Sequence, residues 1–177
     1  MNDKSGISKE SEKRKRTYKN LFHPESIVVV GASSNPLKPG GRVFKNIKDY
    51  GYKGELWAVN PTSKNIQGMP SFENVADLPH APDLSIVAVS SKYILDTLQA
   101  LADKKTGAVI ILTAGFGEKD AKGRETEQEM LKIGAAADMD LIGPNCSGFL
   151  TRSYKGKFAG IIPELPGGAV DIISGSG

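Results

Sequence analysis

The chain has 177 residues, which is room for one domain, and 39% of them are hydrophobic, enough for a packed core. Cys146 is the only cysteine, which excludes an intrachain disulfide framework and a metal site built from cysteines. The sequence has no run of about 18 apolar residues and starts with polar residues, which argues against a membrane-spanning helix and a signal peptide and predicts a cytoplasmic protein.

The first 20 residues carry the basic excess of the chain. They hold seven Lys or Arg and three acids, a net charge of +4 against +3 for the whole sequence, so residues 21–177 sum to −1. The run Lys13-Arg14-Lys15-Arg16 is compatible with a nucleic-acid-binding arm, but it lacks the aromatic interleaving of a stacking platform. We therefore predict that residues 1–20 form a disordered basic leader and that nucleic acid is not the partner.

Residues 26–50 are typical of a strand, a glycine-rich loop and a helix. The β-branched run from Ser26 stops at Gly31, and a loop rich in Gly, Ser and Pro leads to an amphipathic segment from Gly41 to Tyr50. Nucleotide-binding α/β units begin in this way, with the loop backbone and the helix N-terminus facing a phosphate.

The second strand, predicted over Glu55–Val59, lacks the acidic residue of a dinucleotide fold. In such folds an Asp or Glu at the strand end binds the adenosine ribose about 20 residues after the glycines. Here the strand is followed by Asn60-Pro61-Thr62-Ser63-Lys64. A lysine without a carboxylate suits a ribose that carries a phosphate better than a free ribose diol.

The rest of the chain continues the alternation of strands and helices. A short helix is expected near Ser71–Leu78, and longer ones after Ser90-Ser91 and over Ala121–Ala137. Strands are predicted at Leu84–Val89, Ala108–Leu112 and Asp140–Ile142. This alternation predicts an α/β class, Rossmann-like fold: a doubly wound parallel sheet in a single domain.

Sheets of this class bind ligands beyond the carboxyl ends of their strands. In this sequence those ends are short polar segments that all contain Gly, Pro, Ser or Thr: 31–41, 60–64, 89–91, 113–118 and 143–148. Small residues let a ligand approach the backbone closely, and backbone N–H groups bind phosphate well. We expect the ligand to lie along these segments.

Several of these segments carry a family resemblance in the right order. They are Leu21-Phe22-His23-Pro24-Glu25-Ser26-Ile27 with Gly31-Ala32-Ser33, then Ala58-Val59-Asn60-Pro61, Thr113-Ala114-Gly115-Phe116-Gly117-Glu118 and Gly143-Pro144-Asn145-Cys146-Ser147-Gly148. From about residue 21 onward the chain resembles the NDP-forming acyl-CoA synthetases. This family includes the ADP-forming acetate–CoA ligases and, more distantly, the alpha subunit of succinyl-CoA synthetase.

The resemblance implies that residues 21–165 form a CoA-binding domain. The loop matching residues 33–36 holds the CoA phosphates in this family, Lys64 matches a family lysine with an offset of one residue, and Val89-Ser90-Ser91 replaces the usual Val-Pro-Ala. Cys146 lies near the CoA thiol end, where we interpret it as a packing residue rather than a nucleophile. No catalytic residue and no metal site is expected in this part. The implied cofactor-binding residues are Gly31, Ser33, Ser34, Asn35, Pro36, Lys38, Gly40, Gly41, Lys64, Val89, Ser90, Ser91, Thr113, Ala114, Gly115, Asn145 and Cys146.

The catalytic parts of the family are missing from this sequence. Neither His23 nor His80 matches the phosphohistidine motif, and the nucleotide-grasp domain that binds ATP or ADP with Mg is absent. Residues 166–177 resemble the truncated start of the next, ligase domain. The resemblance therefore implies the CoA-binding part of an ADP-forming acyl-CoA synthetase, inactive alone, whose partners are CoA or acyl-CoA and the remaining synthetase domains or a beta subunit.

Other functions stay open. A stand-alone CoA-binding regulatory module needs no histidine, and the CoA-binding part of a protein lysine acetyltransferase would share the resemblance. A nicotinamide oxidoreductase is disfavoured, because both Gly-x-Gly-x-x-Gly and the strand-two acid are absent. The acyl substrate and the oligomeric state, a homo-oligomer included, are left open by the sequence.

Overall fold

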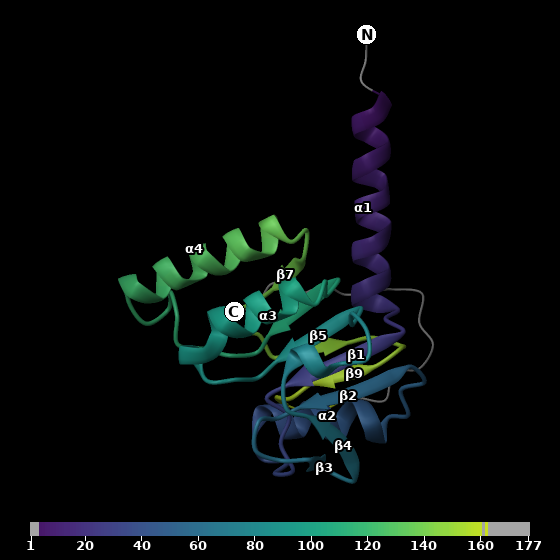
Figure 1. The fold of residues 1–177 in the computed structure, drawn as a ribbon, viewed down its shortest axis with the longest axis vertical. Coiled ribbons are helices and arrows are strands. Elements are labelled where there is room, and N and C mark those ends of the chain that lie inside the picture. Colours follow the sequence, from purple (N-terminus) through teal and green to yellow (C-terminus); the bar gives the residue numbers. More distant parts are fainter. Residues whose placement is uncertain (1–3, 161, 163–177) are drawn as a thin grey trace.

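The computed structural model describes residues 4–160 and 162. Figure 1 shows a central sheet with helices on both sides and one long N-terminal helix that projects beyond it. The helices are α1 (Lys4–Phe22), α2 (Pro39–Asp49), α3 (Ile94–Asp103) and α4 (Ala121–Ala136), with short 3₁₀ helices at Val75–Asp77 and Ser91–Tyr93. The strands are β1 (Ser26–Val30), β2 (Glu55–Val59), β3 (Asn65–Ile66), β4 (Met69–Phe72), β5 (Leu84–Val87), β6 (Ala108–Ile111), β7 (Asp140–Ile142), β8 (Gly148–Leu150) and β9 (Lys155–Lys157).

The main sheet has the strand order β3-β4-β2-β1-β5-β6-β7. All its pairs are parallel except the β3–β4 hairpin. The chain winds outward from β1 in one direction and then crosses to β5 to wind in the other. This confirms the predicted Rossmann-like, doubly wound fold, whose switch point lies between β1 and β5.

Each face of the sheet buries its own hydrophobic cluster. Side chains alternate between the faces along β1, so that Ile27 and Val29 pack with α2 while Val28 and Val30 pack with α3 and α4. Strands β1, β5 and β6 are buried throughout. Burial on both faces explains why these strands read in the sequence as mostly apolar runs rather than as alternating patterns, with Ser26 and Ser85 as their only polar residues.

The predicted disordered leader is wrong for the residues that the structure describes, because residues 4–22 form helix α1. Ion pairs within the helix join Arg14 to Glu10 and Lys15 to Glu12, at the spacings that stabilise helices. Asp138 also pairs with Lys13 at 2.8 Å. The charged residues, whose abundance led to the prediction of disorder, therefore stabilise a helix, because their ion-pair partners lie one turn away or across the fold.

The end of α1 is part of the core. Leu21 packs in the cluster under α2, and its carbonyl accepts a 2.8 Å hydrogen bond from the buried Tyr154 hydroxyl. Tyr154 belongs to the turn of the β8–β9 hairpin, whose strand β9 packs beside α2 and accepts a 2.6 Å hydrogen bond from Asn46 at Lys157 O. The hairpin thus links the first helix to the second.

The other predicted elements agree with the structure except in one region. Near Ser71–Leu78 the expected short helix is reduced to the 3₁₀ turn at Val75–Asp77, and Ser71 lies in strand β4. The strands β3, β4, β8 and β9 were not predicted. Within residues 4–160 and 162, no helix combines the length and apolarity that crossing a bilayer requires. The predicted start of a second domain, residues 166–177, lies outside the described residues.

Candidate functional site

The loop between β1 and α2 is braced by its own side chains. Ser33 Oγ accepts a 3.1 Å hydrogen bond from Asn35 N, and Asn35 Oδ1 accepts one of 2.9 Å from Leu37 N. Asn35 O also accepts from Lys38 N at 3.2 Å. Ser and Asn side chains often hold turns in this way, by replacing backbone partners. The loop therefore has a defined shape without help from a ligand.

Helix α2 begins without a side-chain cap. Lys38 is the N-cap residue and makes no capping hydrogen bond, and Pro39 has no N–H to satisfy. The N–H groups of Gly40 and Gly41 have no acceptor among the described residues. The first N–H groups of a helix need partners and carry its positive dipole end, so they favour an anion.

The two glycines at this helix start let three backbone segments meet. A Cβ on Gly40 would lie 2.1 Å from Gly31 O, and a Cβ on Gly41 would lie 2.0 Å from Asn35 O. Gly31, at φ +84°, lies against Ala88 just after β5, where its own Cβ would come within 2.6 Å of Ala88 O. Glycine is therefore needed at Gly31, Gly40 and Gly41 for packing, which also joins the loop to the end of β5.

Cations surround this loop. Lys38 and Lys64 are exposed, and the ammonium group of neither has a hydrogen-bond or ion-pair partner among the described residues. Arg42 was missed by the sequence reasoning; its Nε donates a 2.9 Å hydrogen bond to Pro36 O from the first turn of α2. The segment around Lys64 lies near the loop, since Ser34 Oγ donates to Asn65 O at 3.4 Å. The two unpaired lysines are thus available to a ligand phosphate.

Asn60 stands where a dinucleotide fold carries its acidic residue. Its Nδ2 donates a 2.8 Å hydrogen bond to Ala32 O, and its Oδ1 accepts from Thr62 N and Ser63 N at 2.9 and 3.0 Å. An amide can donate to one loop and accept from another, whereas an ionised carboxylate can only accept. Asn60 therefore holds two loops together instead of binding a ribose diol.

Thr113 connects the remaining predicted segments. Its Oγ1 donates to Val89 O at 2.8 Å, and its carbonyl accepts from Asn145 N at 2.9 Å. Gly115 lies near Ser91, whose Oγ would be 3.9 Å from a Cβ at that glycine. The structure thus brings together the ends of β5, β6 and β7, which carry the predicted residues Val89, Ser90, Ser91, Thr113, Ala114, Gly115, Asn145 and Cys146.

Glu118 binds the backbone of Gly115, one of the predicted cofactor-binding residues. Its carboxylate accepts hydrogen bonds from Gly115 N at 2.5 Å and from Phe116 N at 3.1 Å. These backbone hydrogen bonds, that of Gly115 first, hold the pKa of the Glu118 carboxyl below its ordinary value. The N–H of Gly115 is consequently used within its own loop, and a ligand contact at this residue would have to use other atoms.

Cys146 is half-buried and packs against the core under α2. Burial raises the pKa of its thiol, which disfavours the reactive thiolate. This environment agrees with the interpretation of Cys146 as a packing residue. Among the residues that the structure describes, no group of three or more His, Cys, Asp or Glu could hold a metal ion.

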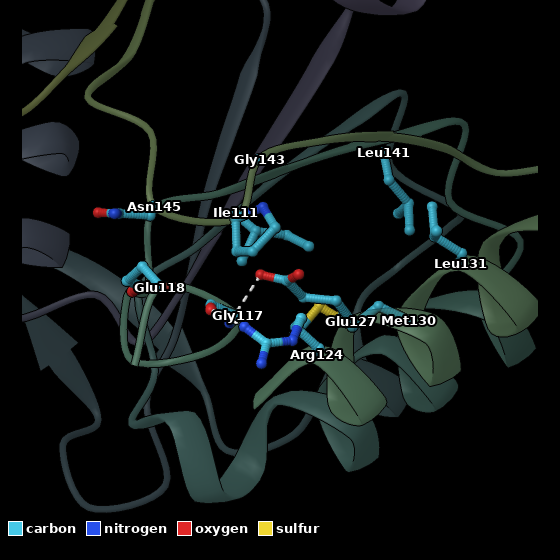
Figure 2. A pocket seen from close by; sticks show the side chains of 11 residues that line it. Ile111, Gly117, Glu118, Arg124, Glu127, Met130, Leu131, Leu141, Gly143 and Asn145 are labelled. Carbon is cyan, nitrogen blue, oxygen red and sulfur yellow. Dashed lines mark hydrogen bonds between the residues drawn. The ribbon is translucent and has the colours of Figure 1, made fainter. Parts of the chain in front are cut away.

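A cavity of about 520 Å³ lies beside the ends of β6 and β7, under α4 (Figure 2). Its lining is mostly apolar, with Ile111, Met130 and Leu141, and Glu127 reaches in to accept a 3.0 Å hydrogen bond from Gly117 N. Asn145 is the one predicted site residue in its lining. The cavity therefore adjoins the strand ends without containing the glycine-rich loop.

A family model described as "CoA binding domain" matches residues 25–152. The chain is 37% identical over 157 residues to the alpha subunit of the ADP-forming acetate–CoA ligase II of Pyrococcus furiosus, covering 89% of this chain and 34% of that protein. It is 32% identical over 161 residues to the ADP-forming acetate–CoA ligase II of Archaeoglobus fulgidus, covering 90% of this chain and 24% of that protein.

Solved structures show the same likeness. The dinucleotide-forming acetyl-coenzyme A synthetase 1 of Ca. Korarchaeum cryptofilum, in complex with phosphate and ADP, superposes with a TM-score of 0.77 at 28% identity, over 82% of this chain and 31% of that one. The chain thus spans about a third, or less, of the length of these relatives.

Proposed function

Because the chain belongs to the CoA binding domain family, we propose that it is the CoA-binding part of an ADP-forming acyl-CoA ligase. The observation that carries the proposal is the uncapped start of α2, where unpaired N–H groups and the unpaired Lys38 and Lys64 surround one braced loop. CoA carries a pyrophosphate and a 3′-phosphate on its ribose. Such a ligand matches a site with several cations and no ribose-binding carboxylate.

The chemistry proposed for the whole enzyme interconverts acid, CoA and ATP with acyl-CoA, ADP and phosphate. In the step that uses this domain, the CoA sulfur attacks the acyl carbon of an acyl phosphate, the carbon–oxygen bond to phosphate breaks, and the thiol proton is lost to the leaving phosphate or solvent. No catalytic role is proposed for the residues of this domain. Their contribution is to bind CoA and position its thiol, which lowers the entropy cost of the reaction.

The parts that would complete the enzyme are proposed partners. They would be further domains of the same protein or a separate second subunit, in line with the relatives, which are named as whole ligases and as an alpha subunit. A homo-oligomer and a cytoplasmic location stay predictions. A regulatory CoA-binding module and the CoA-binding part of a protein lysine acetyltransferase remain alternatives, with no specific observation that favours them.

Ligand-dependent thermal stability tests the proposal. CoA at about 100 times its dissociation constant should stabilise the chain by about 2.7 kcal/mol, while NAD should not. Dephospho-CoA, which lacks the 3′-phosphate, should bind more weakly. Stabilisation by NAD without stabilisation by CoA would overturn the proposal and support an oxidoreductase.

A pair of lysine variants assigns the 3′-phosphate. Lys64→Met should weaken CoA binding about tenfold, about the size of one charge-assisted hydrogen bond, and should leave dephospho-CoA unaffected. Lys53→Met is the matched control, because Lys53 is also exposed but lies in the turn between α2 and β2, at the amino end of the strands. An equal loss for both ligands would contradict the role of Lys64.

A further inference from the structure

The β3–β4 hairpin contains an unusual turn next to the glycine-rich loop. Gln67 and Gly68 connect the two strands, and both have positive φ, +53° and +87°. Two-residue hairpin turns of this kind favour Asn, Asp or Gly at the first position. A residue with a longer side chain there costs about 1 kcal/mol or more, so Gln67 calls for a compensating contact.

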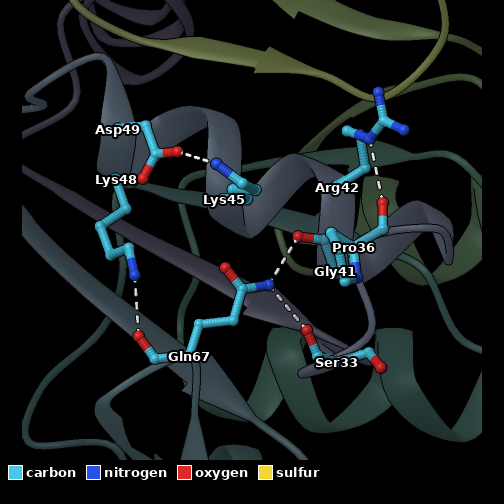
Figure 3. A network of polar contacts seen from close by, with 8 residues as sticks. All are labelled: Ser33, Pro36, Gly41, Arg42, Lys45, Lys48, Asp49 and Gln67. Atoms are coloured by element: carbon cyan, nitrogen blue, oxygen red, sulfur yellow. Dashed lines mark hydrogen bonds and ion pairs between the residues drawn. The ribbon is translucent and has the colours of Figure 1, made fainter.

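The side chain of Gln67 provides that contact. Its Nε2 donates hydrogen bonds of 2.8 Å to both Ser33 O and Gly41 O, as Figure 3 shows. An amide NH₂ has two donors, and both are used. Ser33 lies near the start of the loop and Gly41 at its far end, so one half-buried side chain joins the two ends.

The backbone of Gln67 is also held in place. Lys48, near the end of α2, donates a 2.8 Å hydrogen bond to Gln67 O. Asn65 Oδ1 accepts one of 3.0 Å from Gly68 N inside the hairpin. Hydrogen bonds from α2 and from within the turn thus hold the backbone that carries the Gln67 side chain.

This clamp affects the N–H groups that face a ligand. A trans peptide places its C=O and N–H on opposite sides, so turning Ser33 O toward Gln67 turns the N–H of Ser34 away from the hairpin. That N–H has no acceptor among the residues that the structure describes. Pairing Ser33 O with a donor also removes an unsatisfied, partly negative oxygen from the surroundings of an anion.

We infer that Gln67 is a positioning residue that holds the glycine-rich loop in the shape that binds the pyrophosphate of CoA. The inference rests on the proposed function, because it names the part of CoA that the loop receives. Gln67 does not itself touch the ligand. It acts through the carbonyl groups of Ser33 and Gly41.

The decisive variant is Gln67→Gly, which removes the clamp and relieves the positive φ. Its affinity for CoA and for dephospho-CoA, measured by titration calorimetry, should fall by the same factor, about tenfold or 1.4 kcal/mol, since both ligands carry the pyrophosphate. Its melting temperature should stay close to that of the wild type. Lys105→Gly is the matched control, because Lys105 also has positive φ (+63°) but lies between α3 and β6, at the amino end of the strands.

A second variant keeps the test decisive if the glycine variant folds poorly. Gln67→Glu retains the length of the side chain but, when ionised, cannot donate to the two carbonyl groups. It should therefore also weaken the binding of both CoA and dephospho-CoA. The loss of affinity relative to wild type should become smaller as the pH falls from 7 to 5, because a protonated carboxyl can donate one hydrogen bond.

Each outcome decides between the proposals. Failure of the wild-type chain to bind CoA would refute the proposed function itself. Binding by the wild type, with both variants within twofold of it, would overturn the role of Gln67 alone. Unfolding of both variants would assign Gln67 to the stability of the hairpin and also overturn the inference.

Discussion

Replacing Gly40 by alanine tests the packing that joins the glycine-rich loop to α2. The added Cβ would lie 2.1 Å from Gly31 O and 3.2 Å from Ala88 Cβ. Ordinary contacts begin near 3.4 Å, so the helix start and the loop would have to separate by about 1.3 Å. The atom in the way is a backbone oxygen at the end of a fully buried strand, which no side-chain rotation can move.

The expected cost follows from two opposing effects. Alanine gains at most about 1 kcal/mol over glycine in a helix, and less in its first turn. Overpacking against a rigid backbone costs about 1–3 kcal/mol and sometimes more. Moving α2 would also disturb its own side chains Val43, Phe44 and Ile47, which are completely buried. We expect a net loss of about 2 kcal/mol, which is a fall in melting temperature of about 4–8 °C for a domain of this size.

Urea unfolding and thermal melting of Gly40→Ala measure this loss, and CoA titration measures its effect on the site. Gly134→Ala is the control: Gly134 is also inside a helix, but its Cβ would meet the side chain of Leu141 at 2.8 Å, which can move, and Met139 O only at 3.2 Å. We expect a markedly smaller loss there. A Gly40→Ala protein as stable as wild type, with unchanged CoA affinity, would refute the argument that close approach requires glycine.

Two further predictions concern the loop at the end of β6 and the β8–β9 hairpin. Because its backbone hydrogen bonds, that from Gly115 first, lower the pKa of Glu118, the stability that Glu118 contributes is present above its ordinary pKa of 4.5 and is lost as the pH falls through the folded-state value. Glu118→Gln should therefore melt lower than wild type at pH 7, with a difference that narrows toward pH 3; a difference independent of pH would contradict this. Tyr154→Phe should cost about 1–3 kcal/mol in urea unfolding, because it leaves Leu21 O buried without its donor, whereas Tyr50→Phe, at an exposed position, should cost nothing measurable.

The parallel sheet could be predicted because its strands and helices carry strong local signals. Strands such as β1 and β6 are apolar runs that end at small or polar residues, and the predicted strand over Asp140–Ile142 has the observed bounds. Strands β3, β8 and β9 have two or three residues each, too few for any periodicity. Their pairing depends on contacts with distant residues, such as the hydrogen bond from Asn46 to Lys157 O, which local sequence does not encode.

Helix α1 shows the limit of reasoning from composition. A segment rich in charge and poor in apolar residues resembles a disordered tail when its charges are only counted. Their positions matter more, because Glu10 and Arg14 lie one helical turn apart. The ion pair from Lys13 to Asp138 joins residues far apart in the chain, so only the folded structure reveals it.

The candidate site could be located from the sequence, but not the direction in which its polar groups point. The strand-end rule selected segments that the structure brings to the carboxyl ends of the strands, yet it could not show that Glu118 uses the N–H of Gly115. Nor could it identify Gln67, which lies in a hairpin that the sequence did not predict. Its only local signal is the Gln-Gly pair, which is a weaker turn signal than Asn-Gly.

Side-chain donors pair several carbonyl groups of the glycine-rich loop, and this makes the loop suited to an anion. Asn60 from the end of β2, Gln67 from the β3–β4 turn and Arg42 from α2 each donate to the loop backbone. Between them they satisfy the carbonyl oxygens of Ala32, Ser33, Pro36 and Gly41. A loop with these carbonyl groups already paired, and with free N–H donors and lysine side chains, presents positive partial charge to a ligand at little reorganisation cost. The phosphate binding that we propose would therefore depend on these donors to the loop carbonyl groups as well as on the N–H groups and lysine side chains that are free.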